Sequence, residues 1–260
     1  MKAAAGILLL AAVSAFAEPA PRRAYPWQPS ARPEDSISRR ISPPEGFERA
    51  PTPAGSFAAW LRGLPLRSGR PPVRLFDGRL KARQDAHAAV VDLDVGRKDL
   101  QQCADAVMRL RAEYLYSRGK EAEIKFNMSD GKPLSFAAWA KGDFSYARLR
   151  AYLERVFNYA GSASLSRELR RVGSPAELEL GDVFIKGGYP GHAVIVVDAA
   201  RRPGDGRKVF LLAQSYMPAQ EVHILKNPSD PALSPWYSAD FTGELETPEW
   251  TFTAAQLKRF

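Results

Sequence analysis

The chain is poor in cysteine and histidine. It has 260 residues with a single cysteine, Cys103, and three histidines, His87, His192 and His223. One cysteine excludes a disulfide bond within the chain. Zinc sites use three or four ligands at short, regular spacings, and these four residues show no such spacing. The sequence therefore indicates no metal site, and we expect no cofactor.

Long apolar runs are also missing. The apolar run over residues 6–13 is shorter than the roughly 20 residues that cross a bilayer, and no later stretch approaches that length. We expect no integral membrane segment in the mature chain. Lys2 before this run and Ala15-Phe16-Ala17 after it follow the pattern of a secretory signal peptide. The sequence thus predicts a signal peptide over residues 1–17 and an exported protein, either periplasmic or secreted.

Positive charge is in excess but is scattered along the chain. The formal net charge is +8 at pH 7, which suits an anionic partner such as cell-wall polymer or a lipid surface. A basic stripe interleaved with aromatic residues, which single-stranded nucleic acid needs, is absent from the sequence, so we expect no nucleic-acid partner. Residues 161–165 do not form a Gly-x-Ser-x-Gly motif, which would need a glycine where Leu165 stands. A serine hydrolase is therefore disfavoured.

Proline content divides the mature chain into two parts. Five prolines among arginines over residues 18–36 predict a disordered or extended linker. Residues 37–260 are long enough for one hydrophobic core, and the composition of the chain, 45% hydrophobic and 25% charged, is that of a globular protein. We therefore predict a single domain over 37–260. Its first helix is expected over 56–64, capped by Ser56 and ended by Pro65.

The single cysteine lies in a segment with helical periodicity. Apolar residues recur at intervals of three and four, which predicts a helix from about Asp99 to Tyr116. The predicted buried face holds Leu100, Cys103, Val107, Leu110 and Tyr114, with Arg109, Arg111 and Glu113 largely off it. If Asp99 or a neighbouring residue caps this helix, Cys103 lies within about the first turn, where free N–H groups and the helix dipole favour a thiolate and can face an oxyanion. The alternative is that Cys103 is a small hydrophobe in the core.

A glycine-rich loop and a hairpin follow about ninety residues later. Gly181-Asp182 precedes a strand ending near Ile185, residues 186–191 form the loop, and 193–197 are all apolar or β-branched, which predicts a central strand buried on both faces. Residues 201–207 are expected to turn, and 209–213 to form the return strand. The histidine of this block therefore stands at the opening of a buried strand, beside a loop that gives access to it.

Hairpin arithmetic predicts a partner for His192. If the two strands fold about Pro203, His192 and Gln214 are each eleven positions from the turn and face each other. A histidine base with a polar group that orients its second nitrogen is half of a cysteine-hydrolase site. Asp198 is six positions from His192, roughly 20 Å along an extended strand, and is too far to orient it. The alternative is a structural histidine bonded to a loop carbonyl.

The order of these features resembles the NlpC-type and papain-like cell-wall cysteine peptidases. The resemblance covers roughly residues 95–215, and this chain has Gln102-Cys103-Ala104-Asp105 where that family usually has Asp-Cys-Ser-Gly. It implies an α+β, NlpC/papain-like fold in which a cysteine-bearing N-terminal helix packs on a central antiparallel sheet. It also implies that Cys103 is the nucleophile, His192 the base and Gln214 the orienting residue. The implied substrate is an amide bond in cell-wall peptide or another envelope component.

Three further residues are predicted to bind substrate. Gln102 stands just before the cysteine, and the resemblance to papain-like enzymes implies that a glutamine upstream of the cysteine donates its amide to an oxyanion; the alternative is a solvated residue at the start of the helix. Tyr189 and Gly191 belong to the glycine-rich loop. Gln101 is a second candidate for the oxyanion. Two classes of function remain: a cysteine peptidase or amidase of the cell envelope, and a non-catalytic envelope binding module of the same fold.

The mature chain as a whole resembles an exported bacterial family known only as domain of unknown function number 4846. The resemblance rests on Leu100-Gln101-Gln102-Cys103-Ala104-Asp105-Ala106, on Gly191-His192-Ala193-Val194, and on the block from Leu212 to Gln220. It implies no particular activity.

Overall fold

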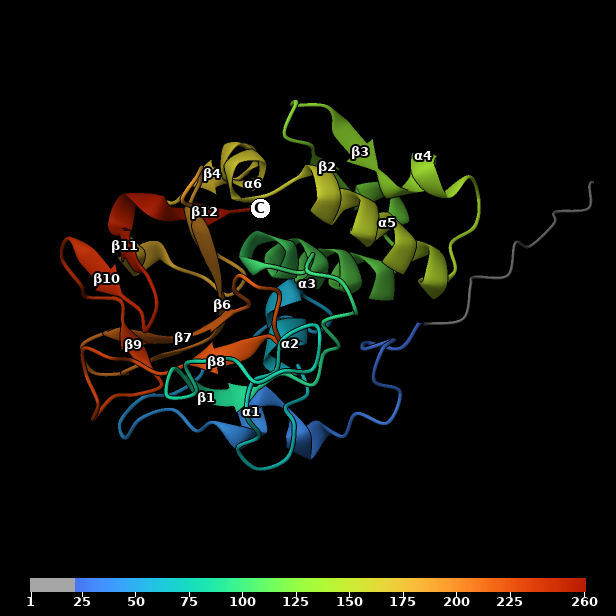
Figure 1. Cartoon of the computed structure of the whole chain (residues 1–260). Coiled ribbons are helices and arrows are strands. Elements are labelled where there is room, and N and C mark those ends of the chain that lie inside the picture. The colour runs from blue at the N-terminus through green and yellow to red at the C-terminus, as the bar shows by residue number, and fades with distance from the viewer. Residues whose placement is uncertain (1–21) are drawn as a thin grey trace, which may run out of the picture.

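An antiparallel sheet forms the centre of the computed structural model, which describes residues 22–260 (Figure 1). The strands are β1 (His87–Val90), β2 (Lys125–Asn127), β3 (Pro133–Ser135), β4 (Arg170–Arg171), β5 (Val183–Lys186), β6 (His192–Arg201), β7 (Lys208–Gln214), β8 (His223–Leu225), β9 (Tyr237–Ser238), β10 (Glu244–Glu246), β11 (Thr251–Thr253) and β12 (Leu257–Arg259). Within the described residues the main sheet has the order β1-β8-β7-β6-β5-β12-β4, with β9 beside β7. The pairs β2-β3 and β10-β11 are separate hairpins.

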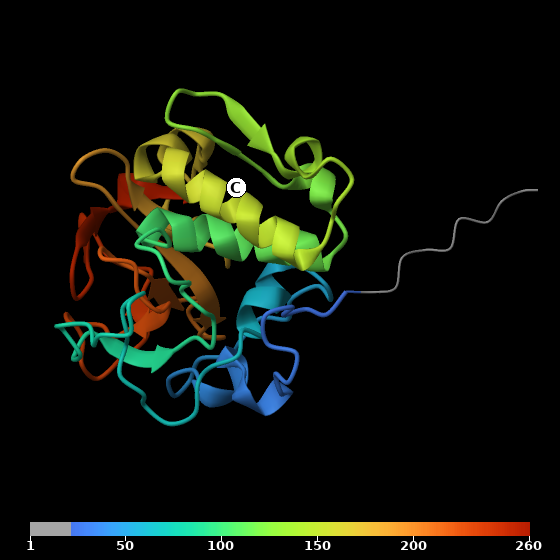
Figure 2. The same cartoon turned by 45° about the vertical axis from the view of Figure 1, so that its right-hand side comes forward.

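The helices gather mainly on one side of this sheet (Figures 1 and 2). They are α1 (Ile37–Arg40), α2 (Phe57–Arg62), α3 (Cys103–Ser117), α4 (Phe136–Ala140), α5 (Tyr146–Tyr159) and α6 (Ser162–Glu168), with short 3₁₀ turns at Pro33–Asp35, Glu121–Glu123, Pro175–Glu177 and Ala254–Gln256. The predicted cap of α2 is confirmed, because the Ser56 side chain accepts a hydrogen bond from the N–H of Ala59.

Strand β6 is the centre of the sheet and is buried on both faces, as its apolar sequence predicts. Ala193, Ile195 and Val197 belong to the core that lies against the helices, whereas Val194 and Val196 belong to a second core on the opposite face. This split follows from the alternation of side chains along a strand. The start of β6, where His192 lies, is therefore packed between the cores on the two faces of the sheet.

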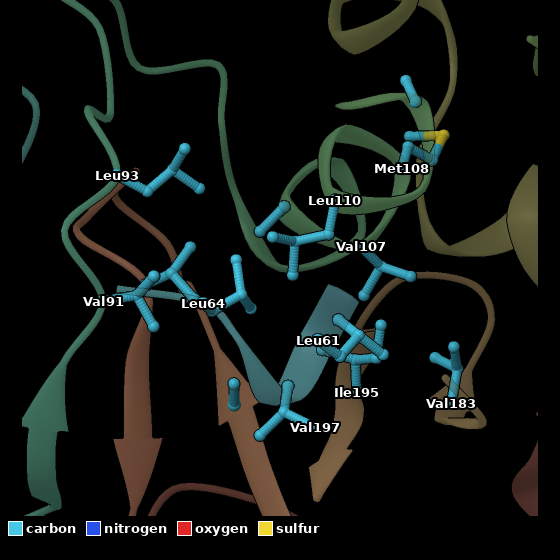
Figure 3. Close-up of a cluster of buried hydrophobic side chains, with 14 of the residues drawn as sticks. Leu61, Leu64, Val91, Leu93, Val107, Met108, Leu110, Val183, Ile195 and Val197 are labelled. Carbon is cyan, nitrogen blue, oxygen red and sulfur yellow. The ribbon is translucent and has the colours of Figure 1, made fainter. Parts of the chain in front are cut away.

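Helix α3 packs on this sheet. Val107 and Leu110 of α3 lie close to Ile195 of β6 and Leu61 of α2 in one buried cluster (Figure 3). Helix α5 runs beside α3 on the side away from the sheet (Figure 2). The mixture of helices and antiparallel strands confirms the α+β class.

Because α5 covers α3, one prediction about the buried face of α3 is wrong. Arg109 and Glu113 were expected largely off the buried face, but both side chains are fully buried. They pair with each other at 3.3 Å; Arg109 also pairs with Asp94 at 2.9 Å, and Glu113 accepts a hydrogen bond from Tyr146 of α5 at 2.8 Å. A helix covered on two sides buries its polar stripe as well, and such charges are tolerated because they are paired.

The segment predicted as a linker, residues 18–36, is packed on the domain from residue 22 onward. Trp60 of α2 donates its indole N–H to Ala24 O at 2.7 Å, and its own carbonyl accepts from the Tyr25 hydroxyl at 2.8 Å. The Trp27 indole donates to Asp92 O at 2.8 Å. Two aromatic residues among the prolines gave this stretch enough apolar surface to dock, which the proline count obscured.

Two further expectations concern the start of the chain and the membrane. The predicted signal peptide, residues 1–17, lies outside the described residues. Within residues 22–260, no helix is long and apolar enough to cross a membrane.

Candidate functional site

Cys103 is the first residue of α3. The helix was expected to begin near Asp99, but Gln102 is its N-cap. The cysteine therefore lies closer to the N-terminus of the helix than predicted. Asp99 instead accepts hydrogen bonds on Oδ1 from the Gln102 side chain at 3.0 Å and from the N–H of Ala219 at 2.6 Å. The first N–H groups of α3 have no partner within the helix, and those of Cys103 and Ala104 act to lower the pKa of the thiol.

The start of α3 is anchored to the chain that follows β7. Besides the contact between Asp99 and Ala219, the Ser215 hydroxyl lies 2.9 Å from the carbonyl oxygen of Gln101. Ser215 is fully buried and directly follows Gln214 in the chain. These contacts hold the cysteine at a set position relative to the strand that carries Gln214.

His192 is the first residue of β6 and is 2% exposed. Its ring lies among three aromatic side chains, with centroid distances of 4.7 Å to Tyr216, 5.4 Å to Trp250 and 5.9 Å to Phe252. The Phe252 ring is nearly parallel to it, at 23°. This packing restricts the imidazole to one orientation.

The predicted pair of His192 and Gln214 forms. Nε2 of His192 lies 2.8 Å from Oε1 of Gln214, and both side chains are buried. The register differs from the prediction, however, because Ile195 is opposite Ala213 and an irregularity between Val196 and Asp198 adds one residue to β6. The two residues therefore do not occupy opposite positions, and their contact crosses the ladder diagonally, which long side chains can reach.

Cys103 and His192 line the same groove, which has a volume of about 540 Å³. Its lining includes Cys103, His192 and the three predicted substrate-binding residues, Gln102, Tyr189 and Gly191. The backbone N–H of Ala193, the residue after His192, also acts to lower the pKa of the Cys103 thiol. Tyr189 is almost fully exposed at the rim.

Burial determines the protonation of this pair. Desolvation, and then the nearby Asp105 carboxyl, raise the pKa of the Cys103 thiol to about 11, despite the opposing effect of backbone N–H groups. Desolvation also lowers the pKa of His192 to about 4, although the hydrogen bond that His192 donates to Gln214 acts in the opposite direction. The N–H groups at the helix start do lower the pKa of the thiol, as expected, but burial outweighs them, so that at neutral pH the pair is a thiol and a neutral imidazole.

Asp105 is a groove residue that the sequence analysis did not single out. Its Oδ2 accepts from the N–H of Gln102 at 3.1 Å, while its buried Oδ1 has no hydrogen-bond partner among the described residues. Burial raises the pKa of Asp105 to about 8, which keeps it largely protonated at neutral pH. Its position two residues after the cysteine was the available signal.

A charged pair behind Gln214 was also missed. Nε2 of Gln214 donates to Oε2 of Glu249 at 2.7 Å, and the same carboxylate forms an ion pair with Lys81. Glu249 lies in the turn between β10 and β11, next to Trp250. Lys81 and Glu249 are 168 residues apart, so no local pattern could have related them.

The remaining candidates lie away from the groove. The Gln101 side chain is buried and binds Arg109 and the carbonyl of Asp94, so it cannot reach an oxyanion in the groove. Asp198 is paired with Arg49 and Arg62, both at 2.7 Å, as expected of a carboxylate that does not orient His192. His223 is fully buried behind Gln214.

Two other kinds of binding site can be assessed in the part of the chain that the structure describes, a metal-binding cluster and a second cavity with free charged groups. In residues 22–260, no group of three or more His, Cys, Asp or Glu side chains is arranged to hold a metal ion. A larger cavity, about 670 Å³, is lined in part by Arg62, Lys208 and Arg259. These cations already bind Asp198, the carbonyls of Ala176 and Leu178, and Asp182, respectively.

Comparison with protein families confirms the resemblance that covers the whole mature chain. The family model described as domain of unknown function 4846 matches residues 37–145 and 143–259. The chain belongs to that family. The two matched segments together contain Cys103, His192, Gln214 and Glu249, so the whole site lies in the part of the chain that the family shares. No curated protein and no solved structure was found to be similar to the chain.

Proposed function

We propose that this protein is a cysteine hydrolase, a peptidase or amidase, exported to the cell envelope. The observation that carries the proposal is the groove in which Cys103, at the start of α3, and His192, hydrogen-bonded to Gln214 at 2.8 Å, line one surface. A helix-borne cysteine, a histidine at the mouth of an antiparallel strand and an orienting amide on the next strand are also the arrangement of papain-like enzymes, whose fold we propose for the domain.

The proposed reaction uses these groups in two stages. The sulfur of Cys103 attacks the amide carbon while His192 takes the thiol proton and passes it to the leaving amine, so that the C–N bond breaks and a thioester remains. The N–H groups of Cys103 and Ala104 face the oxyanion. Water then attacks the thioester, His192 takes its proton, and the carboxylate product leaves as the thiol forms again.

Because the resting pair is neutral, the proposed reaction has to use general-base catalysis rather than a preformed thiolate-imidazolium pair. With the thiol pKa near 11 and the imidazole pKa near 4, the proton stays on sulfur until a carbonyl group is in place. His192 is then available as a base over the whole neutral range, because it is protonated only near pH 4 and below. The amide substrate is proposed to be cell-wall peptide, for which Tyr189, Tyr216 and Trp250 provide apolar walls in the groove.

Acylation by p-nitrophenyl acetate, followed by intact mass, tests the proposal. We expect Cys103 of the mature protein to be acylated, Cys103→Ala to show no adduct, and His192→Ala to be acylated at least about 100-fold more slowly, as befits loss of a general base. His87→Ala is the matched control, because His87 binds the Pro71 carbonyl outside the groove. The wild-type rate should rise with pH through about 4 and then level off.

The raised pKa of the Cys103 thiol also favours a second function, in which the groove binds a ligand but catalyses no reaction. In that case wild-type protein and His192→Ala would react equally slowly with the ester. That result would contradict the hydrolase and leave the binding module.

A further inference from the structure

We propose that Glu249, held by Lys81, is a positioning residue of this site, which keeps the lone pair of His192 on Nδ1. The inference deepens the proposed cysteine-hydrolase function and rests on it. Glu249 does not line the groove; it acts through Gln214, whose amide it orients.

The orientation of Gln214 follows from what each group can donate. A carboxylate only accepts hydrogen bonds, so the atom 2.7 Å from Glu249 Oε2 must be the amino nitrogen of Gln214. The amide oxygen therefore faces His192, at 2.8 Å from Nε2. Because an amide oxygen only accepts, Nε2 of His192 carries the proton, and Nδ1 keeps the lone pair that a general base needs.

The second N–H of Gln214 leads to the same assignment. It points to Nε2 of His223 at 3.3 Å, and Nδ1 of His223 lies 2.8 Å from the carbonyl oxygen of Glu221. A carbonyl only accepts, so His223 carries its proton on Nδ1 and accepts on Nε2. A reversed Gln214 amide would set its oxygen against the Glu249 carboxylate and the His223 lone pair, and would leave buried groups unsatisfied.

Lys81 allows the carboxylate to stay in place. The Lys81 side chain is 5% exposed and the Glu249 side chain 12% exposed, and they form an ion pair. A buried carboxylate without a counter-ion is costly and tends to take up a proton, and a protonated acid could donate a hydrogen bond and no longer dictate the amide orientation. The Lys81 ammonium also lies 5.5 Å from the Tyr216 ring that packs on His192.

The tautomer of His192 can be read from the ¹⁵N chemical shifts of its ring, measured near pH 7, where the imidazole is neutral. We expect wild-type protein to show the proton on Nε2 alone. In Glu249→Gln the new amide can both donate and accept, so only the longer contact with His223, at 3.3 Å, still orients Gln214, and a mixture of the two tautomers is expected. Glu244→Gln, on the same hairpin, is the matched control, because Glu244 is exposed and should leave the tautomer unchanged.

The same variants should differ in reactivity. We expect Glu249→Gln to slow acylation of Cys103 by about 10- to 100-fold, the usual range for a residue that orients a functional ligand from behind. If Glu249→Gln does not fold, the double variant Lys81→Met with Glu249→Met removes both charges together and should give the same loss of the single tautomer.

The outcomes separate this inference from the proposed function. A wild-type His192 with its proton on Nδ1, or a pure Nε2 tautomer retained in Glu249→Gln or in the double variant, would overturn the role of Glu249. Equal acylation of wild type and His192→Ala would instead overturn the hydrolase, whatever the tautomer.

Discussion

At the scale of single residues, the missing side chain of Gly191 determines the position of His192. A Cβ atom at position 191 would lie 2.4 Å from the carbonyl oxygen of Gly188 and 2.4 Å from the Ser162 hydroxyl. No side chain fits there, so the loop before β6 can press against the start of α6 only with glycine at this position. The substrate-binding role of Gly191 stays a prediction, whereas its role in placing His192 follows from this close approach.

We expect Gly191→Ala to lower the free energy of unfolding by about 1–3 kcal/mol, the usual cost of overpacking, and to displace His192. Thermal unfolding measures the first effect, and acylation of Cys103 the second. Gly204→Ala is the control, since a Cβ there would meet no atom within 4 Å. Equal losses in the two variants would contradict the steric explanation.

At the scale of elements, the segment before the first helix is part of the domain. Tyr25 and Trp27 pack together and against Trp60, with ring centroids 5.4 Å and 6.0 Å from it. Phe57 and Tyr114 extend the same aromatic group to α2 and α3. Arg22 reaches α3 directly, with its guanidinium 4.0 Å from the centroid of the Tyr116 ring, so this segment covers the C-terminal end of the helix that begins at Cys103.

A chain that begins at residue 37 should therefore be less stable than one that begins at residue 22. Exposing the surface that Tyr25 and Trp27 cover costs roughly 3 kcal/mol or more, which corresponds to a melting temperature lower by at least about 5 °C. Calorimetry of the two chains measures the difference. An unchanged melting temperature would restore the interpretation of this segment as a linker.

At the scale of the whole molecule, buried titratable groups give stability a pH dependence of two signs. Burial lowers the pKa of His192 to about 4 and of His223 to about 3, so between about pH 6.5 and 4 the unfolded chain binds more protons and stability falls with falling pH. Burial raises the pKa of Asp105 to about 8, so the folded chain binds more protons up to that pH, and stability falls as pH rises toward 8. Above about pH 6.5 only the second effect acts among these groups.

Asp105→Asn should remove that second effect. Asparagine can still accept from the N–H of Gln102, but it does not ionise. We expect the stability of the variant relative to wild type to increase by about 1 kcal/mol per pH unit between pH 5 and 8, measured by denaturant unfolding. Asp85→Asn is the control for the loss of an exposed carboxylate. A difference that does not change with pH would contradict the raised pKa of Asp105.

What the sequence determined by itself was local. The helical periodicity around Cys103, the apolar run after His192 and the turn residues over 201–207 predicted α3, β6 and β7, and chain order alone brought Gln214 near His192. These features depend on neighbours within a few residues, which the sequence displays directly.

The tertiary structure alone decided the rest. The pairing of Lys81 with Glu249, the docking of residues 22–36 and the aromatic packing around His192 join segments far apart in the chain, for which local pattern carries no signal. It also decided the charge state of the site, because the pKa values of Cys103 and His192 depend on how much water the assembled groove removes from them.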